Sequence, residues 1–130
     1  MTSDISAFGL MDTALKASEL RQQVYANNIA NIATPGYKRQ DVNFESMLQQ
    51  VMSTQASSNS GTTLSPSVWN ALSKIQPQVV TDTSTIVNNN GNNVDVNAEM
   101  AKLAENQLRY NGIVQDLQLR LQRMQTAITG

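Results

Sequence analysis

The clearest pattern in this chain is a row of apolar positions near its C-terminal end. Its members alternate three and four residues apart, and all except one glutamine are apolar: Met100, Leu103, Gln107, Tyr110, Val114, Leu117, Leu121, Met124 and Ile128. Such spacing is typical of a helix that lies along another helix. It predicts a helix over residues 97–129, roughly 50 Å long at about 1.5 Å per residue. Asp95 or Asn97 can cap its start, and Glu99 suits the helix dipole there.

The N-terminal segment repeats the spacing. Its row contains six apolar and two polar residues: Phe8, Met11, Leu15, Ser18, Gln22, Tyr25, Ile29 and Ile32. A further set widens the row toward a second contact face: Leu10, Ala14, Ala17 and Val24. This helix must end near Ala33, because Thr34 precedes Pro35. Pro35 and Gly36 then suit the two corners of a tight turn.

The two helices define the predicted fold class. Neither helix can bury its apolar row alone, so we predict a mainly α protein whose long terminal helices pair as an antiparallel coiled coil. The middle is predicted to hold a short helix and an irregular or small β-hairpin segment. The expected organisation is an N-terminal rod helix over residues 1–34, then a turn, short helices and a mobile loop over 35–93, and a C-terminal rod helix over 94–130.

The middle of the chain contains shorter patterns. Asn43 can cap a helix whose apolar residues follow at helical spacing: Phe44, Met47, Leu48, Val51 and Met52. Ser65-Pro66 suits the start of another helix, which would carry Trp69, Leu72 and Ile75. Residues 53–63 are polar and uncharged, which predicts a mobile loop. Residues 78–81 and 85–87 are rich in β-branched side chains, which predicts that they pair as a small hairpin.

Composition narrows the chemistry available. The 130 residues include no Cys and no His, so thiol nucleophiles, disulfides and the usual zinc ligands are excluded. The formal net charge of −1 gives no basic field for nucleic acid or an anionic membrane. No apolar run is long enough for a membrane span, and the first ten residues lack the basic and apolar regions of a cleaved signal. We therefore expect a chain that stays in the cytoplasm or leaves it by a route without such a signal.

Candidate reactive groups are sparse. The ten carboxylates are scattered, and Asp116 and Arg120 have the spacing of a solvated helical ion pair. The Asn-rich turn at residues 87–93 is followed by a single carboxylate, Asp95, which is poor for a metal. Lys38 and Arg39 are expected to lie in a solvated turn. The sequence thus predicts no enzyme activity, no metal, no cofactor and no small-molecule substrate.

Three amides stand out near the end of the N-terminal helix. Asn27, Asn28 and Asn31 occupy positions where asparagine weakens a helix, because its side chain competes for backbone hydrogen bonds. One interpretation is fraying before Pro35. The other is that these amides bond to neighbouring chains or to the returning part of the same chain.

Two stretches carry a family resemblance. Residues 26–39 read ANNIANIATPGYKR, which resembles the N-terminal signature of flagellar rod and hook proteins. Residues 92–111 read NNVDVNAEMAKLAENQLRYN, which is similar to the C-terminal signature of basal-body rod proteins of the FlgB type rather than the sibling FlgC type. The two stretches cover about a quarter of the chain. The middle of the chain departs from any firm family pattern.

The resemblance implies a function. Family members pair their terminal helices, pack side by side in a helical tube, and leave the cell through the flagellar type III export gate without a cleaved signal. The expected function is a structural subunit of the proximal rod in the cell envelope, or periplasm. Expected partners are FlgB-like copies, FlgC, other rod proteins, the adaptor FliE and the export gate. The predicted subunit interface comprises Phe8, Met11, Leu15, Tyr25, Asn27, Asn28, Asn31, Pro35, Gly36, Tyr37, Met100, Leu103, Tyr110, Val114, Leu117, Leu121 and Met124.

Alternatives remain open on the sequence alone. The chain could be the FlgC-type sibling, or a soluble helical-hairpin adaptor that acts as a monomer or dimer. A cell-wall hydrolase would need a suitably spaced pair of carboxylates.

Overall fold

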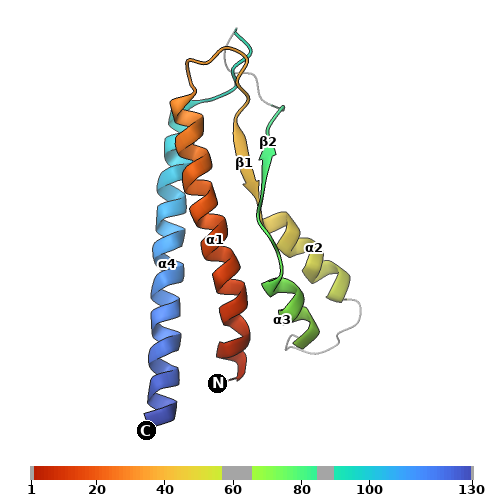
Figure 1. Ribbon diagram of the computed structural model, residues 1–130, viewed down its shortest axis with the longest axis vertical. Coiled ribbons are helices and arrows are strands. Elements are labelled where there is room, and N and C mark those ends of the chain that lie inside the picture. Colours follow the sequence, from red (N-terminus) through yellow and green to blue (C-terminus); the bar gives the residue numbers. More distant parts are fainter. Residues whose placement is uncertain (1, 57–65, 85–89, 130) are drawn as a thin grey trace.

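Two long helices lie side by side along the computed structural model (Figure 1). Helix α1 spans Thr2–Ala30 and helix α4 spans Val96–Thr129, and both chain ends lie at the same end of the molecule. The structure describes residues 2–56, 66–84 and 90–129, with side chains described from residue 7 on and not at 55–56. The predicted antiparallel pairing of the terminal helices is confirmed. No helix in these ranges is long and apolar enough to cross a membrane.

The seam between the helices is held in register by two amides. Asn106 Nδ2 donates to the carbonyl of Ser18 over 2.9 Å, and Asn28 Nδ2 donates to Glu99 Oε2 over 3.0 Å. The predicted row on α4 is half-buried for five of its members: Leu103, Tyr110, Val114, Leu117 and Met124. The remaining four are exposed: Met100, Gln107, Leu121 and Ile128. The seam is therefore thin, as a chain with 5% aromatic residues would suggest.

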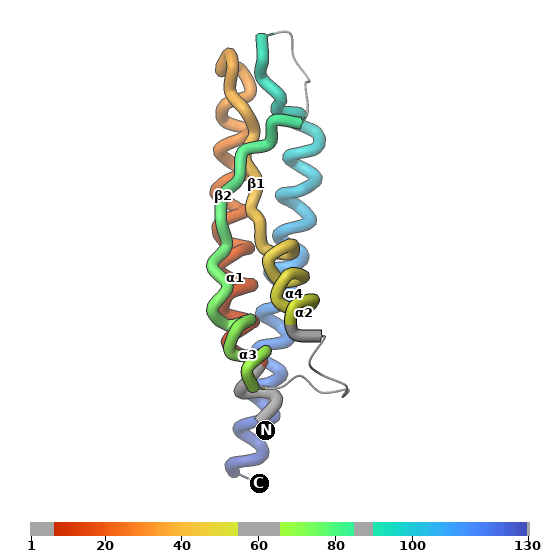
Figure 2. The backbone as a smooth tube through the Cα atoms, turned by 90° about the vertical axis from the view of Figure 1, so that its right-hand side faces the viewer, coloured from red at the N-terminus to blue at the C-terminus, as the bar shows by residue number. Residues whose placement is uncertain are grey.

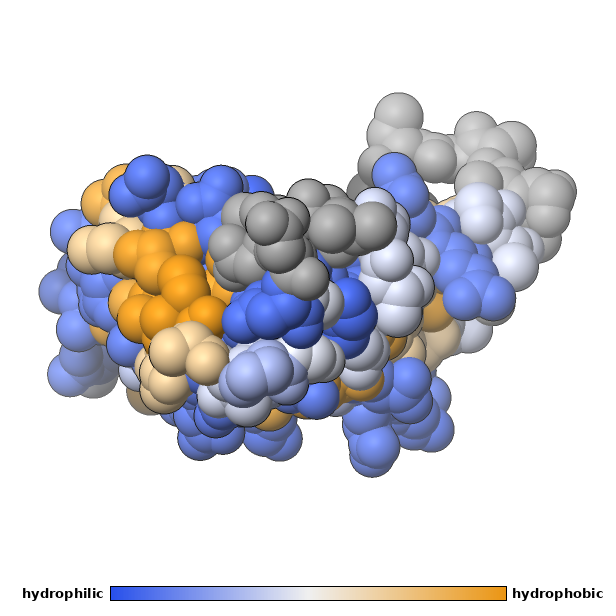
Figure 3. Space-filling model, turned by 90° about the horizontal axis from the view of Figure 1, so that it is seen from above, coloured by the Kyte–Doolittle hydropathy of each residue, from blue (hydrophilic) through white to orange (hydrophobic). Residues whose placement is uncertain are grey.

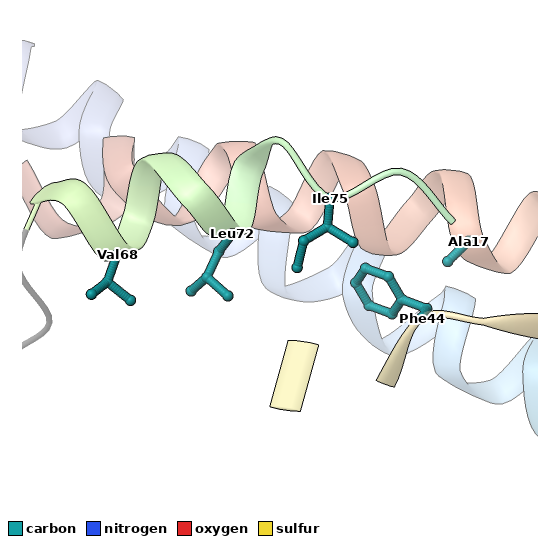
Figure 4. Packing of buried hydrophobic residues seen from close by; sticks show 5 residues of the cluster. All are labelled: Ala17, Phe44, Val68, Leu72 and Ile75. Carbon is teal, nitrogen blue, oxygen red and sulfur yellow. The ribbon is translucent and has the colours of Figure 1, made fainter. Parts of the chain in front are cut away.

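The main apolar cluster lies on the second face of α1. Helices α2 (Glu45–Ala56) and α3 (Pro66–Ser73) bring Phe44, Leu72 and Ile75 against α1 at Ala17 (Figure 4). The predicted second contact face is thus confirmed. Gly9 is needed at this contact, because a Cβ there would lie 2.5 Å from the Cβ of Ser73.

The predicted hairpin is confirmed for one of its two strands. Residues 78–81 do form a strand, β2 (Gln78–Thr81), but it pairs antiparallel with β1 (Gln40–Asn43), in a register that sets Val42 opposite Val79. Residues 85–87, the predicted partner, lie outside the described residues. The sequence did not indicate β1, because four residues with a single apolar side chain give no alternating signal. Its pairing comes from chain segments that α2 and α3 bring together.

The turn predicted after α1 is confirmed. Gly36 has φ +74°, and the Tyr37 amide donates to the Thr34 carbonyl over 3.2 Å. Pro35 and Gly36 therefore occupy the two corners of the expected turn. Helix α1 ends at Ala30, a few residues before the predicted Ala33. Helix α2 continues to residue 56, so the predicted loop over 53–63 is wrong at its start, and its remainder lies outside the described residues.

The strands and short helices follow one another along one side of the helix pair (Figure 2). Both strands lie near the end where α1 finishes and α4 begins, and α2 and α3 lie toward the chain termini. This arrangement divides the molecule into a polar junction at one end and an apolar cluster at the other.

Candidate functional site: the polar junction of the two helices

A buried arginine organises the junction. Arg39 is 6% exposed, and its guanidinium bonds to three carboxylates, one in β1, one in α4 and one directly after β2. Its Nε donates to Glu99 at the start of α4, and its other two nitrogens reach Asp82 over 3.1 Å and Asp41 over 3.2 Å. The expectation that Arg39 lies in a solvated turn is therefore wrong. Three carboxylates around one planar fork compensate the loss of its hydration.

Glu99 is fully buried, with no exposed surface. Its carboxylate accepts from Arg39 on one oxygen and from the Asn28 amide on the other. A buried carboxylate needs such partners, because removing it from water without them costs several kcal/mol. Glu99 therefore ties the first turn of α4 to both α1 and β1, beyond the favourable dipole position predicted for it.

The pKa values of the junction respond to this arrangement. Burial lowers the pKa of Arg39, but its bonds to Glu99, Asp82 and Asp41 outweigh that effect and raise it. Two hydrogen bonds from Ser84, supported by Arg39, lower the pKa of Asp82 to about 2. Burial pushes the pKa of Asp41 upward, yet bonds from the Val42 amide, the Tyr25 hydroxyl and Arg39 bring it below its usual value. Arg39, Asp41 and Asp82 are thus held in their charged forms near neutral pH.

The side chain of Asn28 makes the two hydrogen bonds to the backbone of Gln40 that a neighbouring strand would make. Its side-chain amide donates to the Gln40 carbonyl over 2.8 Å and accepts from the Gln40 amide over 2.9 Å. The Tyr37 hydroxyl also donates to Asn28 Oδ1 over 3.0 Å. Asn28 is fully buried and all of these partners belong to the returning chain. For Asn28, the interpretation as a bond to the returning part of the chain is confirmed, and fraying is excluded.

Two asparagines before α4 complete the junction. Asn92 Nδ2 donates to three carbonyls that follow α1, those of Asn31, Ile32 and Thr34, at 2.8 to 3.0 Å. The Asn31 and Thr34 carbonyls also accept backbone amides within the turn, so Asn92 fastens the turn that follows α1 to the start of α4. Asn93 accepts from the Arg39 amide over 2.6 Å and donates to the Asp82 carbonyl over 2.6 Å. Both residues are buried, so the Asn-rich turn is a structural clamp.

Helical periodicity does not identify the polar residues of this junction. Arg39, Glu99, Asn92 and Asn93 lie within the two stretches that carry the family resemblance, but none belongs to an apolar row. Periodicity selects residues that face a helix partner, and it gives no weight to polar side chains that bond across a junction. All three carboxylates of the cluster are bonded to Arg39, and among the described residues no group of acidic side chains could hold a metal ion.

The residues of the predicted subunit interface fall into three groups by solvent exposure. Three are buried within the chain: Met11, Tyr25 and Asn28. Nine are half-buried: Phe8, Leu15, Asn31, Tyr37, Leu103, Tyr110, Val114, Leu117 and Met124. Five are exposed: Asn27, Pro35, Gly36, Met100 and Leu121. The half-buried and exposed residues are accessible to another chain.

Exposed apolar side chains concentrate on α4. Of the eight large hydrophobic residues that are exposed in the described part of the chain, five belong to this helix: Met100, Leu108, Leu119, Leu121 and Ile128. The end of the helix pair at the junction is also apolar in part, as the view from above shows on the side of α1 and α4 (Figure 3). Such surface on a helix that is already paired is more typical of a subunit than of a monomer.

Comparison with known proteins agrees with this picture. The family "Flagella basal body rod protein" matches residues 12–38. "Flagellar basal body rod protein FlgB" of Bacillus subtilis is 34% identical over 92% of this chain and 91% of its own length. The protein of the same name from Borreliella burgdorferi is 37% identical over 75% of this chain and 76% of its own. That of Salmonella typhimurium is 30% identical over 96% and 94%.

The matches to proteins named FlgB extend over both terminal helices and the junction between them, including the two stretches that carried the resemblance. The chain therefore belongs to the FlgB family of flagellar basal-body rod proteins and is a structural subunit of the rod.

Proposed function

We propose that this subunit polymerises through its paired terminal helices and links the flagellar export gate and the adaptor FliE to the rest of the rod. The observation that supports polymerisation is the exposed apolar surface of α4, where Leu108 and Ile128 are 73% and 74% exposed. Burial of such side chains contributes roughly 1.5–3 kcal/mol each before ordering costs. The proposed interface uses the half-buried and exposed members of the predicted set, and the buried junction holds the two helices in the geometry that presents them.

We further propose that the subunit reaches the envelope through the export gate without a cleaved signal, and that it works without enzymatic activity. The family resemblance supports the first point, and the lack of His and Cys in the sequence supports the second. Its other expected neighbours are further copies, FlgC and the remaining rod proteins.

Leu121→Asp tests polymerisation. Leu121 is 51% exposed, so a charge there leaves the folded subunit intact but places an unpaired carboxylate in the proposed contact. We expect normal expression and an unchanged unfolding midpoint, with loss of rod assembly and motility. Gln122→Asp, one residue further along the same exposed helix, is the matched control and is expected to assemble. Motile cells carrying Leu121→Asp would contradict the proposal for this face.

A soluble helical-hairpin adaptor is the second candidate. It would bind rod components without being built into the rod in many copies. Counting fluorescently tagged copies in isolated basal bodies separates the two, because a polymerising subunit is present several times and a single adaptor is not.

A further inference from the structure

A groove on one side of the seam has the chemistry of a receptor for a positively charged side chain. It lies between α1 and α4, has a volume of about 320 Å³, and is lined mainly by Glu19, Gln22, Gln23, Asn106, Gln107 and Tyr110. A cavity of this size accommodates one long side chain. Glu19 is its single charged residue, and no hydrogen bond or ion pair of Glu19 occurs among the described residues.

Asn106, which borders the groove, has a buried acceptor without a donor. Asn106 is 4% exposed, and its Nδ2 is used by the Ser18 carbonyl. In the described part of the chain, its Oδ1 is the one buried side-chain nitrogen or oxygen atom without a hydrogen-bond partner. A buried carbonyl oxygen without a donor makes the potential around it negative, which favours a cation next to Asn106.

Tyr110 adds an aromatic surface to the same groove. A guanidinium or ammonium group placed there can lie against the ring while it pairs with Glu19. The three features, an unpaired carboxylate, an unpaired buried carbonyl and an aromatic ring, all favour the same kind of occupant.

The opposite side of the seam carries the cations of α4 within a network of mixed charge. A second groove there is lined by the cations Arg21, Lys102 and Arg109 and by the carboxylates Asp41, Glu45 and Glu105, and Asn106 borders both grooves. Arg123 lies two heptads after Arg109, and Arg120 lies eleven residues after it, so the cations of α4 share one flank of the helix with their i,i+4 partners Glu105 and Asp116. Arg109 is 53% exposed at its side chain, and exposed ion pairs such as its contacts with Glu45 and Glu105 can be exchanged for a carboxylate of another chain at little cost.

We propose that the groove at Glu19 and Tyr110 receives a lysine or arginine side chain from the cationic flank of α4 in a second copy of this chain. Donor and receptor lie on opposite sides of the seam, so the contact is heterologous and can continue from subunit to subunit without closing into a dimer. The inference rests on the proposed polymerisation and specifies which surfaces meet.

Cysteine cross-linking tests the contact, because the chain has no native Cys. Two versions of the chain are co-expressed with different tags in cells that lack the wild-type copy. One carries Gln22→Cys at the groove, and the other carries a cysteine in place of Lys102, Arg109, Arg120 or Arg123. We expect mild oxidation of basal bodies to give a mixed dimer for one of these four pairs. The matched control, Gln118→Cys on an uncharged exposed position of α4, is expected to give none.

Charge reversal gives an independent readout. Glu19→Lys is expected to leave the unfolding midpoint unchanged, since Glu19 has no partner among the described residues, and to weaken incorporation into the rod by about tenfold or more. Asp12→Lys, on the same face of α1 and seven residues away, is the control and is expected to have a much smaller effect. Reversal of the cross-linking cation in the same chain as Glu19→Lys is expected to restore incorporation.

These experiments distinguish a failure of the groove contact from a failure of the proposed polymerisation. Basal bodies that contain both tagged chains but yield no mixed dimer at any of the four positions would overturn the groove contact, as would equal effects of Glu19→Lys and Asp12→Lys. The proposed polymerisation would then still stand on the Leu121→Asp result. If only one copy is found in each basal body, the polymerisation fails, and the groove contact fails with it.

Discussion

The two ends of this subunit are held together by different forces. At the junction, Arg39, Glu99 and Asn28 bond across α1, β1 and α4 with defined partners and distances. At the other end, Leu72 and Phe44 pack with other apolar side chains against α1. Apolar packing tolerates shifts in register, whereas hydrogen bonds and buried ion pairs permit one arrangement. The junction therefore defines the geometry of the helix pair, and the apolar cluster supplies much of its burial.

Loss of the central arginine should have the largest effect. Arg39→Met leaves Glu99 buried without its cation, and we expect a loss of about 3–5 kcal/mol in the free energy of unfolding. Chemical denaturation followed by circular dichroism measures it. Arg109→Met removes an exposed arginine that also bridges two carboxylates, and it should cost less than about 1 kcal/mol. Equal losses for the two variants would mean that burial of the ion pair is not what matters.

The apolar cluster should respond to a cavity. Leu72 is 1% exposed, and Leu72→Ala should cost about 2–5 kcal/mol in unfolding free energy. Leu108→Ala, on the exposed face of α4, should change it by less than about 0.5 kcal/mol. Hydrogen exchange distinguishes the apolar cluster from the junction, because Leu72→Ala should increase amide exchange in α2 and α3 more than at the junction. Uniform acceleration along the chain would show instead that the two ends unfold as one unit.

The clamp formed by Asn92 should contribute less. Asn92→Ala removes donors to three carbonyls after α1 and an acceptor for the Val94 amide, and we expect a loss of about 1–3 kcal/mol. Asn97→Ala, an exposed asparagine in the first turn of α4, serves as the control in the same thermal-unfolding measurement. A wild-type melting temperature for Asn92→Ala would show that water replaces the clamp at little cost.

Acid should weaken the junction before the apolar cluster. The pKa of Asp82 falls from 3.8 to about 2 in the folded chain, and that of Asp41 is also lowered. A carboxylate with a lowered pKa stabilises the fold above its unfolded pKa, and that contribution is lost as the pH falls through the folded pKa. We expect unfolding free energy to be constant above about pH 5 and to decline between about pH 4 and 2. Fluorescence of the single tryptophan, Trp69, can follow the transition at each pH, and a flat profile across this range would argue against the junction's role.

Sequence patterns predicted the apolar parts of the molecule well. The row from Leu103 to Met124, the cap at Asp95 and the turn at Pro35-Gly36 all rest on local rules, namely helical spacing, side-chain capping and backbone preference. The Asp95 side chain accepts from the Asn97 amide over 3.0 Å, as an N-cap does. Local rules need no knowledge of the fold, so a single sequence is sufficient for them.

The contacts that define the candidate site could not be predicted from local rules. Asn28 and Glu99 stand 71 residues apart, and Arg39 and Asp82 stand 43 apart. A polar residue gives the same local signal whether it lies in water or in a buried network. The resemblance indicated that the two stretches belong to one family, but it did not indicate that they bond to each other.

The two long helices, their apolar rows, the turn after α1 and the family resemblance can all be recognised from the residues alone. The pairing of β1 with β2, the burial of Arg39 among three carboxylates, and the groove and the cations on the two sides of the seam are visible only in the folded chain. The physical reason is that periodicity records which residues avoid water, whereas the partner of each polar group depends on where distant segments of the chain meet.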